Sequence, residues 1–98
     1  MRIIAESRLK GMAEEHGDCV EQIATWIRIV RAAHWSNLIE VRQVYPHADA
    51  VDQFTVFNIK GNDYRLVVGI DYQWETLYIK HLFPHAKYDK GDWKRDKR

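Results

Sequence analysis

The sequence predicts a single α+β domain, residues 1–98, in which N-terminal helices pack on one side of a small antiparallel sheet. Apolar residues recur with helical spacing before Pro46, and they alternate with a period of two after Val51. No change of composition divides the chain, whose 98 residues are the length of one domain. Helices followed by strands and short turns are typical of this fold class.

The first half of the chain is expected to hold a short strand and three helical segments. Gly17 follows a run of helix-forming residues and is expected to cap its C-terminus. Asp18 and Glu21 have the spacing of a capping box, which predicts the start of a second helix. Pro46 should end the third segment. The predicted ranges are 3–4 for the strand and 6–16, about 20–33 and 36–44 for the helices.

The second half is expected to form a meander of three strands, at 53–59, 64–72 and 77–83, after a polar connector at 47–51. Leu66, Val68 and Ile70 alternate along the middle strand and should face the helices. Arg65, Tyr78 and Lys80 should then lie on the opposite face. That face is polar enough to contact solvent or an anion, although one solvated face is ordinary for an antiparallel sheet.

Cysteine content and hydropathy limit the class of protein. Cys19 is the single cysteine, so the chain forms no internal disulfide and has no paired-cysteine zinc motif. The N-terminus lacks the apolar stretch of a signal peptide, and no segment approaches membrane-spanning length. These observations predict a cytoplasmic protein without a membrane partner. A chain this short has no room for a deep chamber, which favours a shallow site and a polymeric substrate.

The basic residues are concentrated toward the C-terminus. Residues 1–59 carry 6 Lys and Arg against 8 Asp and Glu, whereas residues 60–98 carry 9 against 6. Such a charge run is more often a solvated terminus than a binding site. If it binds RNA, the cations expected to contribute are Lys87, Lys90 and Lys94.

Residues 81–90 contain the largest share of reactive side chains. Cleavage of RNA through its own 2′-hydroxyl needs proton transfer, which histidine performs near neutral pH, and cations that stabilise charge on the phosphate. His85 follows Pro84 at a strand exit, where a functional role is favoured. His81 alternates with Leu77 and Ile79, which favours a core histidine over a functional one.

A metal site is disfavoured in the same segment. His81, His85 and Asp89 have the spacing of ligands on one helix, but Pro84 interrupts any helix that begins at His81. No nucleotide-binding, zinc-protease or serine-hydrolase motif is present. We therefore expect neither a metal nor a cofactor.

Two stretches resemble the HigB toxins of bacterial toxin–antitoxin systems. Residues 57–66, Phe-Asn-Ile-Lys-Gly-Asn-Asp-Tyr-Arg-Leu, are similar to the family pattern F-N-x-x-G-N-x-[YF]-R-[LV]. Residues 84–89, Pro-His-Ala-Lys-Tyr-Asp, are similar to T-H-x-E-Y-D, with departures at Pro84 and Lys87. The resemblance covers nearly the whole chain, including the Val-Tyr-Pro step at 44–46.

This resemblance implies a RelE-like fold, in the order β-α-α-β-β-β, and a metal-independent mRNA endoribonuclease that acts on translating ribosomes. It also implies a HigA-type antitoxin with a helix-turn-helix domain, and operator DNA bound only through the toxin–antitoxin complex. Arg65, His85 and Tyr88 are carried over from the family, with Lys80 as a further catalytic residue and Lys60 as an RNA-binding one. Arg65 and Lys80 would hold the phosphate, His85 would transfer a proton, and Tyr88 would orient or stack the RNA.

Two other functions fit the same residues. The chain could be a non-catalytic RNA- or ribosome-binding module that uses the basic face without cleavage. It could also be a degenerate toxin that serves only as the antitoxin's partner.

Overall fold

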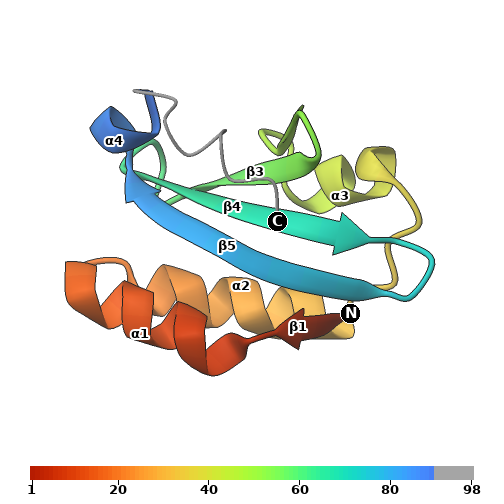
Figure 1. Ribbon diagram of the computed structural model, residues 1–98, viewed down its shortest axis with the longest axis horizontal. Coiled ribbons are helices and arrows are strands. Elements are labelled where there is room, and N and C mark those ends of the chain that lie inside the picture. The colour runs from red at the N-terminus through yellow and green to blue at the C-terminus, as the bar shows by residue number, and fades with distance from the viewer. Residues whose placement is uncertain (90–98) are drawn as a thin grey trace.

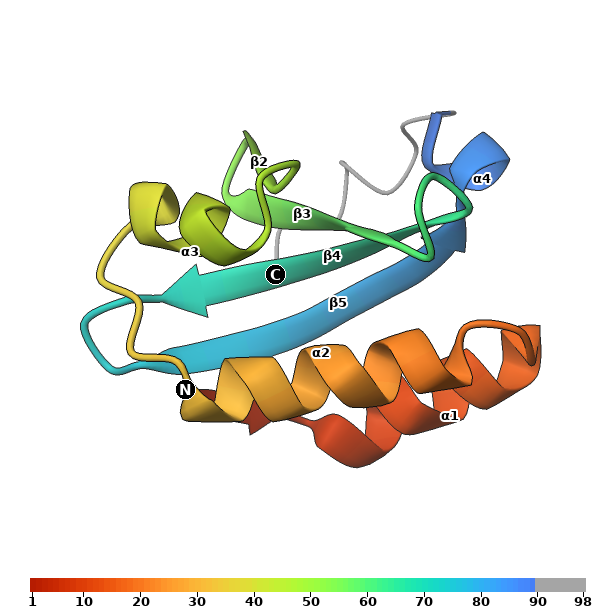
Figure 2. The ribbon, with the colours of Figure 1, turned by 180° about the vertical axis from the view of Figure 1, so that it is seen from behind.

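The computed structural model describes residues 1–89, which form a five-stranded sheet and four helices. Helices α1 and α2 lie side by side against one face of the sheet (Figures 1 and 2). The α+β prediction is confirmed, and the helix expected at 36–44 is present as α3; β2 and α4 were not predicted. The elements in chain order are β1 (Arg2–Ile4), α1 (Glu6–His16), α2 (Val20–Ala32), α3 (Leu38–Val44), β2 (Asp49–Val51), β3 (Phe54–Ile59), β4 (Tyr64–Asp71), β5 (Thr76–Pro84) and α4 (His85–Asp89).

The strands are arranged in the order β1-β5-β4-β3-β2. Strand β1 runs parallel to β5, and every other neighbouring pair is antiparallel. In the β4–β5 pair, Tyr64 lies opposite Pro84 and Arg65 lies opposite Phe83. The start of β4 and the end of β5 are therefore neighbours, which joins the two sequence stretches that resemble the toxin family.

The connector expected at 47–51 is partly wrong, because Asp49–Val51 forms β2 at the edge of the sheet and pairs with β3. Arg42 of α3 helps to hold this strand. Its Nε donates to the carbonyl of Ala48 at 2.8 Å, and its Nη2 donates to the Asp49 carboxylate at 3.2 Å. Strand β2 has only three residues, which are exposed or half-buried, so it is too short to show the alternation that predicts a strand.

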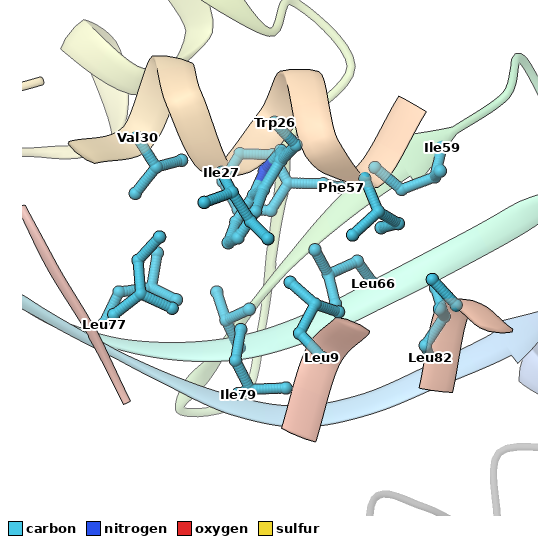
Figure 3. Close-up of a cluster of buried hydrophobic side chains, with 14 of the residues drawn as sticks. Leu9, Trp26, Ile27, Val30, Phe57, Ile59, Leu66, Leu77, Ile79 and Leu82 are labelled. Carbon is cyan, nitrogen blue, oxygen red and sulfur yellow. The ribbon is translucent and has the colours of Figure 1, made fainter. Parts of the chain in front are cut away.

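The main core lies between the sheet and the two long helices. Figure 3 shows Trp26, Ile27 and Val30 pointing from α2 toward Leu66, Leu77 and other side chains of the sheet. The Trp26 and Phe57 rings meet edge to face, with their centres 5.4 Å apart. This burial is the principal stabilising contribution to the fold. No helix within residues 1–89 is long and apolar enough to cross a membrane.

The two predicted helix caps have different outcomes. Gly17 caps α1 as expected, with φ of 82° and its N–H bonded to the Ala13 carbonyl at 2.9 Å. The Asp18 cap is wrong, because Cys19 occupies the N-cap position of α2 and no side chain caps that helix. The Asp18 carboxylate instead accepts hydrogen bonds from Tyr64 and Lys60.

The sheet face opposite α1 and α2 is only partly polar. Arg65 lies on this face as predicted, but Val67, two residues along, is completely buried there. Phe54, Val56 and Val67 form a second small apolar cluster, against which Phe83 and Tyr88 pack. Strand β4 is thus covered on both faces near its middle, which gives the candidate site a rigid base.

Candidate active site

Arg65 occupies the sheet face opposite the long helices, close to the β3–β4 turn. Its Nη1 donates to the carbonyls of Asn62 and Tyr64, both at 3.2 Å, and its Nη2 to the Asn62 side chain at 3.4 Å. The guanidinium carbon lies 5.7 Å from the centre of the Tyr88 ring. The turn and the aromatic ring therefore fix the direction of the guanidinium.

Helix α4 places Tyr88 against this arginine, and it begins at His85 beside the β3–β4 turn. Pro84 ends β5, and the backbone N–H of His85 donates to the Asp63 carbonyl at 2.9 Å. That bond ties α4 to the β3–β4 turn. His85 is exposed, whereas Tyr88 is half-buried against the second apolar cluster. The structure thus brings Arg65 and Tyr88 into contact and places His85 at the start of the same helix as Tyr88.

A β-bulge changes the facing of β5. Val67 pairs with His81 and Val68 pairs with Ile79, so Lys80 is the extra residue between them. Beyond the bulge the alternation is inverted, and His81 and Phe83 lie opposite Val67 and Arg65. The expected alternation of His81 with Ile79 is therefore wrong, whereas the ring is still half-buried. Its ring stacks on Phe83, with centres 4.8 Å apart and planes inclined by 15°.

Lys80 lies further along the open face than Arg65. Its Nζ is 5.9 Å from the centre of the Tyr78 ring, and Gly69 on β4 pairs with Tyr78. A depression of about 200 Å³ lies here, lined by Gln53, Phe54, Gly69, Ile70, Asp71, Tyr78 and Lys80. With a rise of about 3.3 Å per residue, three positions separate Lys80 from Phe83 by about 10 Å along the strand. Lys80 and Arg65 therefore occupy separate positions along the open face.

Two of the four predicted RNA-binding lysines lie within the described residues, and they occupy different parts of the surface. The Nζ of Lys87 lies 5.3 Å from the centre of the Phe83 ring, and Phe83 lies opposite Arg65 in the β4–β5 pair. Lys60 points elsewhere, since its Nζ donates to Asp18, in the α1–α2 loop, at 3.1 Å. Lys90 and Lys94 lie outside the described residues.

Asp18, Tyr64 and Lys60 form a polar cluster that the sequence did not predict. The Tyr64 hydroxyl donates to Asp18, and this bond, with that from Lys60, lowers the pKa of the Asp18 carboxyl. The same Asp18 bond, assisted by burial, raises the pKa of Tyr64 to about 12. Charge-assisted bonds to a sheet residue compete with helix capping, which explains why Asp18 does not cap α2. Asp18 and Tyr64 are 46 positions apart, so no local pattern could have revealed the contact.

Among residues 1–89, no group of three or more His, Cys, Asp and Glu side chains could hold a metal ion. The side chains that converge on the Arg65 end of the open face are cationic, aromatic or imidazole groups. This set can bind a phosphate, stack a base and transfer a proton, which are the requirements of RNA cleavage through the 2′-hydroxyl.

The two-layer fold, with this cationic and aromatic site at the end of β4 and β5, defines a small α+β protein of the RelE-like class. The family of HigB toxins, described as the RelE-like toxic component of a toxin–antitoxin system, matches residues 19–91. The chain belongs to this family, and its partner is therefore an antitoxin.

Proteins similar to this chain over most of its length carry related names. The mRNA interferase HigB of Escherichia coli O6:H1 (strain CFT073) is 24% identical over 93 residues, which are 92% of this chain and 90% of that protein. The mRNA interferase toxin HigB of Escherichia coli (strain K12) is 24% identical over 92 residues, 91% of this chain and 88% of that protein. The mRNA interferase HigB of Shigella flexneri is similar to the same degree.

Proposed function

We propose that this chain is an mRNA endoribonuclease that cleaves its substrate on the ribosome and is neutralised by a HigA-type antitoxin. The observation that carries the proposal is the Arg65–Tyr88 contact, in which a guanidinium oriented at 5.7 Å over a tyrosine lies beside the helix that begins at His85. Family membership supports a toxin, and the names of the relatives support mRNA as the substrate.

The proposed reaction is a transesterification followed by release of the downstream RNA. The 2′-oxygen attacks the adjacent phosphorus and loses its proton, and the bond from phosphorus to the 5′-oxygen breaks. The leaving 5′-oxygen gains a proton, and the upstream fragment ends in a 2′,3′-cyclic phosphate. Neither an oxidant nor a metal is needed to balance this step.

Each side chain has a distinct role in this reaction. Arg65 binds the non-bridging oxygens of the scissile phosphate and stabilises the charge that develops on them. His85 transfers a proton, and Tyr88 orients the RNA while it holds the guanidinium. Lys80 binds a neighbouring phosphate, given its position further along β5.

Ribosome dependence and repression are further parts of the proposal. The site is shallow and is formed by the end of a hairpin and a short helix, so it can approach a strand held in a larger particle. Ribosomal RNA would attract a basic surface by long-range electrostatics. The toxin would act in the cytoplasm, and it would contact operator DNA only through the helix-turn-helix antitoxin.

Expression without the antitoxin tests the proposal. Induction of the wild-type chain in bacteria should arrest growth and create new mRNA ends within translated regions, whereas His85→Ala should create far fewer. Co-expression of the antitoxin encoded beside the gene should restore growth. Growth arrest without new RNA ends would instead support a ribosome-binding module.

A further inference from the structure

A groove of about 410 Å³ lies between α1 and β5, adjoining the candidate active site. Strand β1 pairs with β5 only over Thr76–Tyr78, so within residues 1–89 the later part of this edge has α1, not a strand, beside it. The groove residues are Met12, Glu15 and His16 from α1, and His81, Leu82, Phe83, Pro84 and Lys87 from β5 and α4.

Backbone groups along this edge are already engaged by α1. Arg8 donates to the carbonyls of Ile79, at 2.8 Å, and Lys80, at 3.1 Å. The His16 Nε2 lies 3.3 Å from the Leu82 carbonyl oxygen. An added peptide strand would need these carbonyls. The groove is therefore suited to a ligand that is recognised by side chains.

The side chains of the β5 wall have the chemistry of a site for single-stranded RNA. His81 and Phe83 are stacked, and the ammonium of Lys87 lies 5.3 Å from the Phe83 ring centre. Proteins bind unpaired nucleotides by combining aromatic surface for the base with cations for the backbone. An apolar peptide would leave the Lys87 ammonium and the His16 and His81 imidazoles without polar partners in the ligand.

The α1 wall adds a carboxylate that can read the base. Glu15 is exposed on the rim of the groove, and a carboxylate there repels a phosphate but accepts a hydrogen bond from an amino group. Adenine, cytosine and guanine each carry an exocyclic amino group. Uracil lacks an exocyclic amino group, and its one donor on the pairing edge, N3–H, lies between two carbonyls that a carboxylate repels.

We propose that this groove binds one unpaired nucleobase next to the cleavage site, and that Glu15 favours bases with an exocyclic amino group. Phe83 lies opposite Arg65 in the β4–β5 register, so the groove adjoins the residue assigned to the scissile phosphate. The position of the base relative to cleavage rests on the proposed function, whereas binding of the base does not.

Titration of isotope-labelled protein with nucleoside monophosphates tests the binding, because nuclear magnetic resonance detects weak association. The probes are AMP, CMP and UMP at millimolar concentration. The backbone signals of Glu15, His16 and Leu82 should shift with AMP and CMP at several-fold lower concentration than with UMP. Absence of any shift at these positions would overturn the proposal.

Glu15→Gln supplies the variant, and Glu14→Gln supplies a matched control that removes the same charge from the neighbouring exposed position outside the groove. Glu15→Gln should reduce the preference for AMP over UMP by about tenfold, the lower end of the range for a hydrogen bond to a charged group, because Glu15 is exposed. Glu14→Gln should leave the preference unchanged. Equal effects of the two variants would show a general electrostatic influence and overturn the assignment to Glu15.

Mapping of mRNA ends separates this inference from the proposed function. If the wild-type chain cleaves and Glu15→Gln changes the base found beside the cut, both stand. Cleavage with an identical base profile in Glu15→Gln would overturn the positioning of the base while the endoribonuclease proposal stands. Selective nucleotide binding without cleavage would overturn the endoribonuclease proposal alone.

Discussion

The guanidinium of Arg65 lies over the ring of Tyr88, with 5.7 Å between the guanidinium carbon and the ring centre. Arg65 belongs to β4 and Tyr88 to α4, so the contact joins the sheet to the last described helix. The Asn62 carbonyl holds the same guanidinium from the turn side at 3.2 Å. A cation that is oriented before the substrate arrives stabilises developing charge with little reorganisation, which is the basis of electrostatic catalysis.

Replacement of Arg65 should separate phosphate binding from folding. Arg65→Ala should lower ribosome-dependent cleavage by about 10²-fold or more, because it removes a charged hydrogen-bond donor from the transition state. The free energy of unfolding should change by less than about 1 kcal/mol, since the bonds that Arg65 makes are at the surface. Cleavage of a reporter mRNA and thermal denaturation measure the two effects.

Arg42→Ala is the matched control for Arg65. Arg42 is likewise an arginine held by side-chain hydrogen bonds to its neighbours, but it lies on α3 beside β2. Its replacement should leave cleavage unchanged. Unfolding of Arg65→Ala, or cleavage at the wild-type rate, would show that Arg65 is structural.

His85→Ala should reduce cleavage by about 10²- to 10⁴-fold, the usual contribution of a general acid or base. Co-sedimentation with ribosomes should persist, because His85 is exposed and its backbone N–H still bonds to Asp63. Since the RNA 2′-hydroxyl is the proposed nucleophile, wild-type activity should survive EDTA under conditions that preserve the ribosome. The upstream products should end in a 2′,3′-cyclic phosphate or 3′-phosphate.

The exposed His47, in the loop before β2, provides the control for His85. His47→Ala should cleave normally. Products with 3′-hydroxyl ends, or activity abolished by EDTA and restored by a divalent cation, would indicate metal-assisted attack by water instead.

Features set by local sequence periodicity could be predicted. The helix at 20–32 and the strands β3 and β4 follow from apolar spacing, and the alternation of Leu66 and Val68 places Arg65 on the open face. The likeness of residues 84–89 to a family pattern pointed to His85 and Tyr88. In each case the information that supports the prediction lies within a short stretch of the sequence.

Features set by contacts between distant residues could not be predicted. The bulge at Lys80 inverts the facing of His81, and the carbonyls beside it are bonded by Arg8, which lies 71 and 72 positions earlier. Asp18 has the local sequence pattern of a helix cap, but its carboxylate accepts a hydrogen bond from Tyr64 of β4 and does not cap α2. In both cases the outcome depends on contacts between residues far apart in the sequence, which a local pattern does not contain.

The Asp18–Tyr64 bond predicts loss of stability at both ends of the pH range. The pKa of Asp18 is lowered from 3.8, so its contribution is present above this value and is lost as the pH falls through the folded-state pKa. The pKa of Tyr64 is raised from 10.0 to about 12, so its contribution is present below pH 10 and is lost as the pH rises toward 12. Denaturation midpoints across the pH range should therefore decline in both windows.

Tyr64→Phe should lower stability at neutral pH and flatten the alkaline decline, because phenylalanine keeps the ring but neither donates nor ionises. Tyr78→Phe, at an exposed tyrosine of β5, should change neither. An alkaline decline that is as steep in Tyr64→Phe as in the wild type would contradict the assignment to this pair.

Arg8 should control the facing of His81 through the bulge. Its guanidinium donates to the carbonyls of Ile79 and Lys80, on either side of the peptide link where the alternation of β5 changes. Arg8→Ala leaves both carbonyls to water, and its free energy of unfolding should fall by about 1 kcal/mol, since the side chain is largely exposed. Amide hydrogen exchange should accelerate locally at residues 79–82, because the bulge is no longer held against α1.

The functional consequence distinguishes this role from a general loss of stability. Arg8 does not line the groove beside His81, yet Arg8→Ala should decrease cleavage by several-fold at a temperature where the variant remains folded, because His81 and Phe83 follow the bulge along β5. Lys10→Ala, which removes the same charge from an exposed position on the same helix, should affect neither exchange nor cleavage. If both variants behave alike, the bulge is maintained by the strand pairing itself, and Arg8 contributes only surface charge.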